Sequence, residues 1–230
     1  MTLLLVAIWV LVGTGLVAFI AGRKPRVSSM IGVSGAILGS VLGVIPAAQS
    51  LLGHEVPEIQ LPWQTSLGGS FFLEIDALSA FFLIPMFLVT ALASVYGSTY
   101  LPSLGGRRSV GTAALFFNLL TASLTLVLTA RNGLLFLLAW EIMTLASYAL
   151  IILDRDDPKV RAAGWTFLVA SHLGTAFLFV MFLLLAQVGG ESSLDFGHPE
   201  TFPAISASMA TALFVLALIG FGTKAGFMPL

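Results

Sequence analysis

Residues 213–230 read LFVLALIGFGTKAGFMPL, an apolar run followed by three glycines, a lysine and a proline. The apolar half is typical of a helix that crosses a membrane. The second half is costly there, because glycine and proline weaken a helix and a lysine inside a bilayer needs a partner, a cavity or an altered pKa. Such a segment in a hydrophobic chain is typical of proteins that move a charged species. We therefore expect a helix break formed by Gly220, Gly222, Gly226 and Pro229.

The composition of the whole chain agrees with a membrane protein. Of its 230 residues, 58% are hydrophobic and only 9% are charged, against about 25% charged in soluble domains; the mean hydropathy is +1.03. The absence of cysteine excludes thiolate-ligated iron–sulfur clusters and structural zinc within this chain. We predict an all-α, polytopic membrane helix bundle whose partners include the lipid bilayer and exclude nucleic acid.

Seven apolar runs are long enough to cross a membrane. We predict spans at about residues 2–22, 28–52, 77–101, 110–129, 134–153 and 162–188, and a seventh that starts between 204 and 212. The stretch 53–70 contains prolines and glycines and predicts a loop or short hairpin outside the membrane. Asp76 is the expected N-cap of the third span, and Arg131 to Gly133 form a tight turn.

The basic residues divide between the loops in an alternating pattern. Eight of the ten lie in alternate loops, Arg131 lies in the opposite set, and Lys224 lies within a span; the eight are Arg23, Lys24, Arg26, Arg107, Arg108, Arg155, Lys159 and Arg161. The positive-inside rule then predicts an N-terminus outside the membrane. The first span has no basic residue before it, so we interpret it as a retained helix and not as a signal peptide.

Two sets of residues predict close contacts between helices. Gly35, Gly39 and Gly43 recur at four-residue spacing in the second span and form a small-residue ridge. A polar stripe on the fourth span is expected to hydrogen-bond between helices; its members are Asn118, Thr121 and Thr125.

Glu141 is the acidic residue that lies inside a span, about 10 Å into a hydrocarbon core about 30 Å thick. Its own helix offers no cation, since positions 137, 138, 144 and 145 are Leu, Leu, Thr and Leu. A protonated or structurally paired glutamate is one interpretation, and a functional carboxyl is the one we favour. Thr144 and Tyr148 share its helix face, so a polar stripe is expected to face inward.

Lys224 has two possible environments. It lies about 18 Å deep if the seventh span begins near Ala212, but it approaches the inner surface and snorkels if the span begins at Ala204. The neighbouring glycines favour an ion site on a discontinuous helix. Burial and mutual attraction act in opposite directions on a glutamate and a lysine, so moving one of them can switch their protonation.

His172 lies about ten residues into the sixth span, with Thr175 on the same face. It is either a buried neutral histidine that hydrogen-bonds across helices or part of a proton relay, because histidine titrates near physiological pH. Motifs of soluble sites are absent from the sequence: there is no Walker-type loop, dinucleotide fingerprint, zinc spacing or Ser/His/Asp set in a loop context.

Several of these residues occur in motifs that resemble a known family. The segments WE at 140–141, LASYALI at 145–151 and GTKAGFMPL at 222–230 resemble the fifth- and seventh-helix motifs of the antiporter-like proton-channel subunits. These subunits occur in the NADH-quinone oxidoreductase, the Mrp cation/proton antiporters and the membrane-bound hydrogenases. The segments SHLGTAF at 171–177 and SLDF at 193–196 are most similar to hydrogenase-4 component B and formate hydrogenlyase subunit 3.

The resemblance implies roles for individual residues. Lys224 would be the proton-carrying lysine, Glu141 the partner that modulates its pKa, and His172 a member of the central polar axis, while Pro229 would belong to the helix break. No cofactor is expected in this chain; iron–sulfur, nickel–iron or flavin and quinone centres would lie in partner subunits. Those partners would be other membrane subunits of a respiratory or hydrogenase complex in the cell inner membrane.

The resemblance also implies a division of the chain and a function. Residues 1–109 would form an N-terminal three-helix segment, and 110–230 the start of the first proton-translocating bundle. Family members continue beyond this point, so we expect an N-terminal fragment whose seventh helix is truncated. The expected function is that of a non-redox, proton-carrying subunit of a redox-driven complex. The alternatives are an Mrp-type cation/proton antiporter subunit, in which Na+ is also transported, and an inactive truncated fragment.

Overall fold

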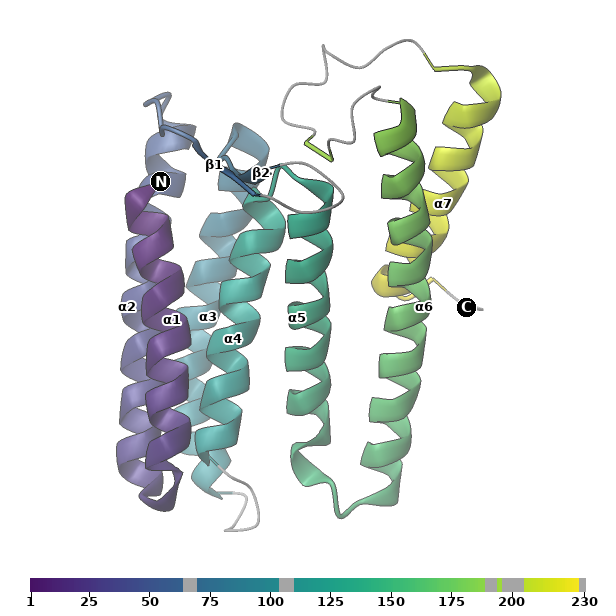
Figure 1. Ribbon diagram of the computed structural model, residues 1–230. Coiled ribbons are helices and arrows are strands. Elements are labelled where there is room, and N and C mark those ends of the chain that lie inside the picture. The colour runs from purple at the N-terminus through teal and green to yellow at the C-terminus, as the bar shows by residue number, and fades with distance from the viewer. Residues whose placement is uncertain (64–69, 104–109, 189–193, 196–204, 228–230) are drawn as a thin grey trace.

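The computed structural model describes residues 1–63, 70–103, 110–188, 194–195 and 205–227. It contains seven helices long and apolar enough to cross a membrane, which confirms the predicted all-α polytopic bundle (Figure 1). Their bounds are α1 Thr2–Ile20, α2 Pro25–Leu51, α3 Ala77–Ser103, α4 Val110–Thr129, α5 Gly133–Ile151, α6 Pro158–Val188 and α7 Ala207–Ala225. Short 3-10 turns follow two of them, η1 Ala21–Arg23 and η2 Ile152–Asp154.

The helices form a row in which neighbours in space are mostly neighbours in sequence (Figure 1). Helix α1 packs against α2 and α4, α5 lies between α4 and α6, and α7 packs against α6. Helix α4 therefore contacts both the N-terminal group and α5. The division of the chain at residue 109 stays a prediction, because the packing of α4 is shared between the two sides.

Two helices begin earlier than their apolar runs. Helix α2 starts at Pro25 and α6 at Pro158, whereas the hydrophobic pattern predicts starts near 28 and 162. Proline is favoured in the first helical turn because the N–H it lacks would have no partner inside the helix. At α6 the Asp157 carboxylate also accepts the backbone N–H of Lys159 at 2.8 Å. The polar first turn is thus helical although it is not apolar.

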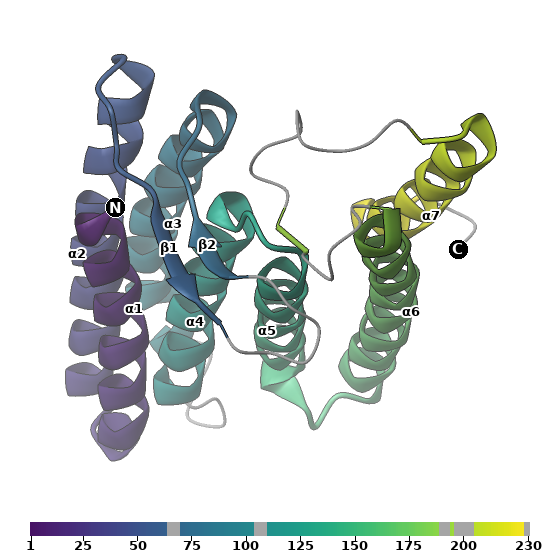
Figure 2. The same cartoon turned by 45° about the horizontal axis from the view of Figure 1, so that its top comes forward.

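The stretch after α2 contains the predicted hairpin. Strand β1 Ile59–Pro62 pairs antiparallel with β2 Ser70–Leu73, at the end of the bundle where α5 begins (Figure 2). The backbone N–H of Arg131 donates to the Phe72 carbonyl at 2.9 Å, and Asn132 forms a β-bridge with Asp195. The hairpin is therefore tied to the first turn of α5 and to the segment that follows α6.

The basic residues of the described loops lie at the ends of the bundle that the loop pattern predicts. The turn at residues 21–24 and the connection 152–157 lie at one end of the bundle, and the hairpin with the start of α5 lies at the other (Figure 1). Arg131 is thus at the opposite end from Arg23 and Arg155. Residues 104–109, which hold Arg107 and Arg108, lie outside the described residues.

The predicted glycine ridge of α2 is confirmed as a packing surface. A Cβ atom at Gly35 would overlap the Thr14 side chain, and one at Gly43 would overlap the Phe87 ring. The predicted polar stripe of α4 is confirmed at two of its members and wrong at the third. Thr121 Oγ1 lies 3.4 Å from Thr90 Oγ1 of α3, whereas the Thr125 hydroxyl donates to the Thr121 carbonyl of its own helix at 2.8 Å. The Asn118 amide donates to Thr14 Oγ1 at 3.1 Å and to the Gly32 carbonyl at 3.2 Å. These contacts join α1, α2 and α4 into one packed unit.

Replacing Gly35 by valine is expected to destabilise the fold by about 1–3 kcal/mol, the range for overpacking of a filled interior. The reason is that the Thr14 side chain occupies the space of the new Cβ atom. Thermal unfolding of the detergent-solubilised chain measures the change. Gly13→Val is the matched control, because nothing lies within 4 Å of a Cβ at Gly13; equal melting temperatures of the two variants would contradict the packing argument.

Asp76 caps α3 as predicted and also pairs with a cation. Its Oδ1 atom accepts the backbone N–H of Ser79 at 2.7 Å and lies 3.1 Å from Arg131 Nη2. Arg131 Nε also lies 3.0 Å from Glu74 Oε2. Burial acts to raise the pKa of Asp76, but the hydrogen bonds from Ser79 and the positive charge of Arg131 outweigh it and lower that pKa below its ordinary value.

Asp76→Asn is expected to lower the free energy of unfolding at pH 7 by less than about 1 kcal/mol, because the carboxylate is half exposed and its ion pair is screened by solvent. Asparagine keeps the helix cap, so the variant isolates the charge. The pKa of Asp76 is lower in the folded protein than in the unfolded chain. The stabilisation by its carboxylate is therefore complete above the pKa of the unfolded state, about 3.9, and is lost as the pH falls through the pKa of the folded state. Unfolding measured from pH 7 to pH 3 should show the two proteins converging, and a constant difference would refute the linkage.

Candidate functional site

Glu141 on α5 faces His172 on α6. Glu141 Oε2 lies 3.2 Å from His172 Nε2, so the partner that α5 itself cannot supply comes from the next helix. The pair lies in a shallow apolar groove between the two helices, and Thr175 lines the same groove as predicted. His172 is 49% exposed and Glu141 28% exposed, so the histidine is not the fully buried one that one interpretation assumed.

The hydrogen bonds of His172 determine how many protons the pair holds. His172 Nδ1 lies 2.9 Å from the Leu168 carbonyl oxygen, and a carbonyl can only accept, so Nδ1 carries a proton. In the neutral ring Nε2 is then a bare acceptor facing a carboxyl oxygen. Their contact requires one further proton, on either Nε2 or Oε2. The geometry therefore fits one proton between Glu141 and His172, with the pair as carboxylate and imidazolium or as carboxylic acid and imidazole.

The second carboxyl oxygen of Glu141 has a different environment. Oε1 is buried and has no hydrogen-bond partner among the described residues. A buried acceptor without a partner is costly, because its interaction with water has been lost and nothing replaces it. Oε1 is therefore an open position at which a proton, a water molecule or another donor would be stabilised.

Lys224 on α7 points toward α5 but binds a residue other than Glu141. Its Nζ atom donates to Thr144 Oγ1 at 2.7 Å. The same nitrogen lies 5.6 Å from the centre of the Trp140 ring and 5.0 Å from that of Phe167, distances at which aromatic faces attract a cation. The amine is thus surrounded by one hydroxyl and two aromatic rings.

Thr144 can only accept in this contact. Its hydroxyl proton is donated to the Trp140 carbonyl at 3.0 Å, so the oxygen offers lone pairs to Lys224. An amine can donate to such an oxygen whether it is charged or neutral, whereas a carboxylate favours the charged form. Within the described residues no ion pair joins Lys224 to Glu141. The expected pair therefore forms no direct ion pair in this structure. Lys224 of α7 contacts Thr144, which lies one helical turn from Glu141 on α5.

Helix α7 reaches this site by close packing on α6. A Cβ atom at Gly174 would lie 3.0 Å from the Gly220 carbonyl oxygen, so the two backbones touch at this crossing. Gly220 and Gly222 were expected to break the helix, but both lie inside the continuous α7, where small residues are needed for contact with α6 and with Phe227. Gly226, also a member of the expected break, does end the helix, and its φ of 83° is left-handed. Pro229 lies outside the described residues.

Three members of the site have no role that the sequence predicts. Thr144 is predicted only as a neighbour on the face of Glu141, Gly174 belongs to a motif, and Phe167 is not predicted at all. Phe167 and Gly174 carry no local signal, because an aromatic residue and a glycine are ordinary in an apolar helix. The described residues bring together no group of three or more metal-ligating side chains.

Comparison with known proteins agrees with the motifs. Residues 130–230, which include α5 to α7, match the family described as NADH:quinone oxidoreductase/Mrp antiporter, TM. The chain is 32% identical over 220 residues to hydrogenase-4 component B of Escherichia coli (strain K12), an alignment that covers 92% of this chain and 30% of the relative. This chain belongs to the antiporter-like membrane subunit family.

Other antiporter-like members are similar over most of the chain. NADH-quinone oxidoreductase subunit L of Escherichia coli (strain K12) is 31% identical over 185 residues, covering 78% of this chain and 30% of that protein. A chain of the Mrp complex from Dietzia sp. DQ12-45-1b has the same fold, with a TM-score of 0.75 and 22% identity over 98% of this chain and 24% of its own length. The antiporter-like chain thus spans about a third of the length of these two curated relatives.

Proposed function

We propose that this chain is a membrane subunit of a redox-driven, proton-translocating complex and that protons pass through Glu141, His172 and Lys224. The observation that carries the proposal is the 3.2 Å contact between Glu141 Oε2 and His172 Nε2, two atoms that need a proton between them, next to a lysine held by a neutral acceptor. A structural ion pair would need neither the half-exposed histidine nor the separate position of the lysine.

The proposed transfer uses two positions of Lys224 on the surface of α5. Thr144 and Glu141 are three residues apart in one helix, so their Cβ atoms are about 5–6 Å from each other. At Thr144 the amine can lose or gain a proton without losing its hydrogen bond. Near Glu141 the carboxylate stabilises the ammonium form. Movement between the two positions would therefore change the protonation of the lysine.

The Glu141–His172 pair would supply the other half of the exchange. When Lys224 arrives as an ammonium, its charge favours the glutamate in the carboxylate form, and the shared proton moves to His172 Nε2. When the lysine leaves, the proton returns toward the carboxyl. Each step is a proton transfer between existing groups, so the chain itself needs no redox centre.

Sequence similarity supports a redox-linked complex. The relatives named hydrogenase-4 component B and NADH-quinone oxidoreductase subunit L are each more than 30% identical to this chain, and both names denote parts of oxidoreductases. The proposed partners are accordingly other membrane subunits, located with this chain in the cell inner membrane. The nickel–iron, iron–sulfur, flavin or quinone centres would lie in those subunits.

Proton uptake into inverted membrane vesicles that contain the complete complex tests the proposal. Addition of the electron donor should acidify the vesicle interior, and an uncoupler should abolish the signal. The experiment is repeated without sodium and with the redox subunits deleted. Sodium-dependent proton flux that persists without the redox subunits would instead show a cation/proton antiporter subunit.

A further inference from the structure

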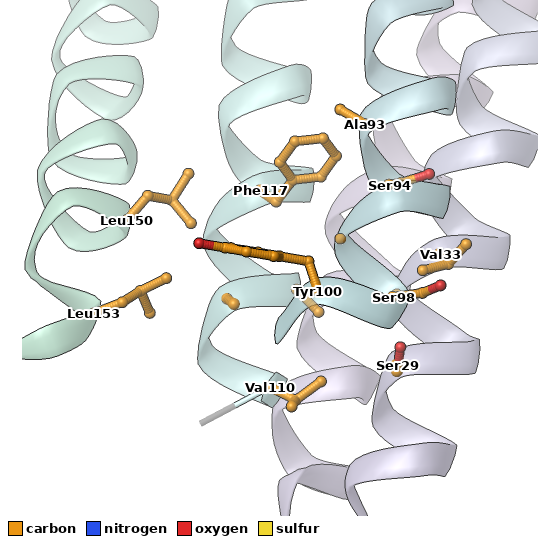
Figure 3. A pocket seen from close by; sticks show the side chains of 14 residues that line it. Ser29, Val33, Ala93, Ser94, Ser98, Tyr100, Val110, Phe117, Leu150 and Leu153 are labelled. Atoms are coloured by element: carbon orange, nitrogen blue, oxygen red, sulfur yellow. The ribbon is translucent and has the colours of Figure 1, made fainter. Parts of the chain in front are cut away.

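A second cavity lies at the end of the bundle opposite the hairpin. Helices α2, α3, α4 and α5 surround a space of about 220 Å³, which is shown in Figure 3. Much of its wall consists of small residues, namely Gly32, Ala93, Gly97, Ala113 and Ala114. At Gly97 in particular the space is unfilled, because nothing lies within 4 Å of a Cβ atom there, whereas Gly32 lets α2 pack closely against Ala114.

The wall of the cavity offers hydrocarbon and very little free hydrogen-bonding capacity. The hydroxyls of Ser94 and Ser98 both donate at 2.7 Å to carbonyls of their own helix, those of Ala91 and Val95. Leu150 of α5 and Leu153 of η2 close one side, and the Tyr100 ring lies across the space (Figure 3). Engineered apolar cavities of about 150 Å³ remain dry and bind hydrocarbons. An acyl chain matches this lining better than a polar ligand does.

Basic residues lie just beyond the lining of the cavity, at the start of α2. Arg26 precedes Ser29 by one helical turn in α2, so it lies on the same face and about 4.5 Å closer to the helix end. Arg23 and Lys24 come immediately before α2, and all three side chains are exposed. No ion pair joins them to an acidic group in the described part of the chain. Tyr96 and Tyr100 stack at the same end with ring centres 5.5 Å apart, as is typical of a membrane–water interface.

We propose that this cavity binds an anionic phospholipid of the inner leaflet. One acyl chain enters the apolar space between α2, α3 and α5, and the phosphate lies against Arg26 with Arg23 and Lys24 nearby. Basic groups next to a bilayer attract anionic headgroups. An acyl chain in the cavity would make van der Waals contacts that the small residues cannot make with one another. This site is separate from Glu141, His172 and Lys224, so it does not depend on the proposed proton pathway.

Native mass spectrometry of the purified chain with equal amounts of dioleoyl phosphatidylglycerol and dioleoyl phosphatidylcholine tests the proposal. The wild type should retain phosphatidylglycerol in preference to phosphatidylcholine. Gly97→Leu should lower retained phosphatidylglycerol at least about tenfold, because leucine fills the cavity from a position at which nothing lies within 4 Å of the new Cβ. Gly13→Leu, which makes the same change at a second open position of another helix, should bind as the wild type does.

The headgroup contact is tested separately. Arg26→Gln should remove the preference for phosphatidylglycerol while acyl-chain binding continues, and Lys159→Gln, an exposed lysine on α6, should leave the preference unchanged. Melting temperatures confirm that each variant is folded; if Gly97→Leu is not, Ala93→Phe narrows the same cavity from an exposed position. Equal lipid retention in the Gly97→Leu and Gly13→Leu proteins, or a preference independent of Arg26, would overturn the proposal. Displacement of the lipid by an added quinone would show that the cavity selects a neutral ligand.

Discussion

Glu141→Gln in the complete complex is expected to lower redox-driven proton translocation at least about tenfold, an increase of about 1.4 kcal/mol in the limiting barrier. Glutamine has nearly the shape of glutamate and can still contact His172, but it cannot share a proton with Nε2. The pair would then lose the exchangeable proton that the Leu168 contact leaves between Nε2 and Oε2. Vesicle acidification per electron transferred is the quantity to measure.

The assembly of the complex must be checked in parallel. Glu58→Gln provides a matched control, because Glu58 is exposed in the segment before β1 and lies outside the spans. The subunit content of the purified complex should be the same for both variants. Translocation at the wild-type rate in a fully assembled Glu141→Gln complex would refute the proposed role of the carboxyl group. A matching loss in His172→Gln would support the shared-proton pair.

Lys224→Met is expected to have an effect of the same size, at least about tenfold on translocation. Methionine keeps an unbranched, apolar side chain that can still pack between Trp140 and Phe167, but it has no proton to exchange. The loss should therefore appear in transport and not in the stability of the bundle. Lys159→Met serves as the control, since Lys159 is exposed at the start of α6; a stable, assembled Lys224→Met complex that pumps normally would exclude the lysine from the pathway.

Thr144→Val tests one of the two proposed positions of Lys224, the position at Thr144. Valine has the shape of threonine but cannot accept the hydrogen bond from Nζ that the structure shows at 2.7 Å. If Lys224 rests at Thr144 during the cycle, the pH profile of translocation should shift while the maximal rate changes less than it does in Lys224→Met. A structural role of the hydroxyl would instead lower assembly and leave the profile of the assembled fraction unchanged.

The candidate site was predictable in part, and the reason is the cost of burying charge. Glu141 and Lys224 stand out because ionisable residues inside apolar spans are rare and expensive, so their positions alone indicate function. Thr144 and Phe167 could not be identified in the same way, because neither is unusual in a membrane helix. Their contacts with Lys224 exist only because α7 packs on α6 at Gly174 and Gly220.

The ends of helices also depend partly on local sequence and partly on tertiary packing. Asp76 was recognised as a cap because a cap is a contact between residues three apart. Gly220 and Gly222 were interpreted as a helix break because glycine has low helix propensity. In the structure the packing surface of α6 stabilises a continuous helix through both residues, so tertiary contact outweighs local propensity.

The sequence by itself determined that the chain is a bundle of seven apolar helices and that the described basic turns, at residues 21–24 and 152–157, lie at one end of it. The reason is that hydrophobic length and loop charge are properties of each segment alone. It also determined that Glu141, His172 and Lys224 are ionisable residues within the apolar spans. Only the tertiary structure decided that Glu141 faces His172 and that Lys224 faces Thr144. These pairings depend on the rotation and contact of α5, α6 and α7, which are set by interlocking side chains from distant parts of the chain.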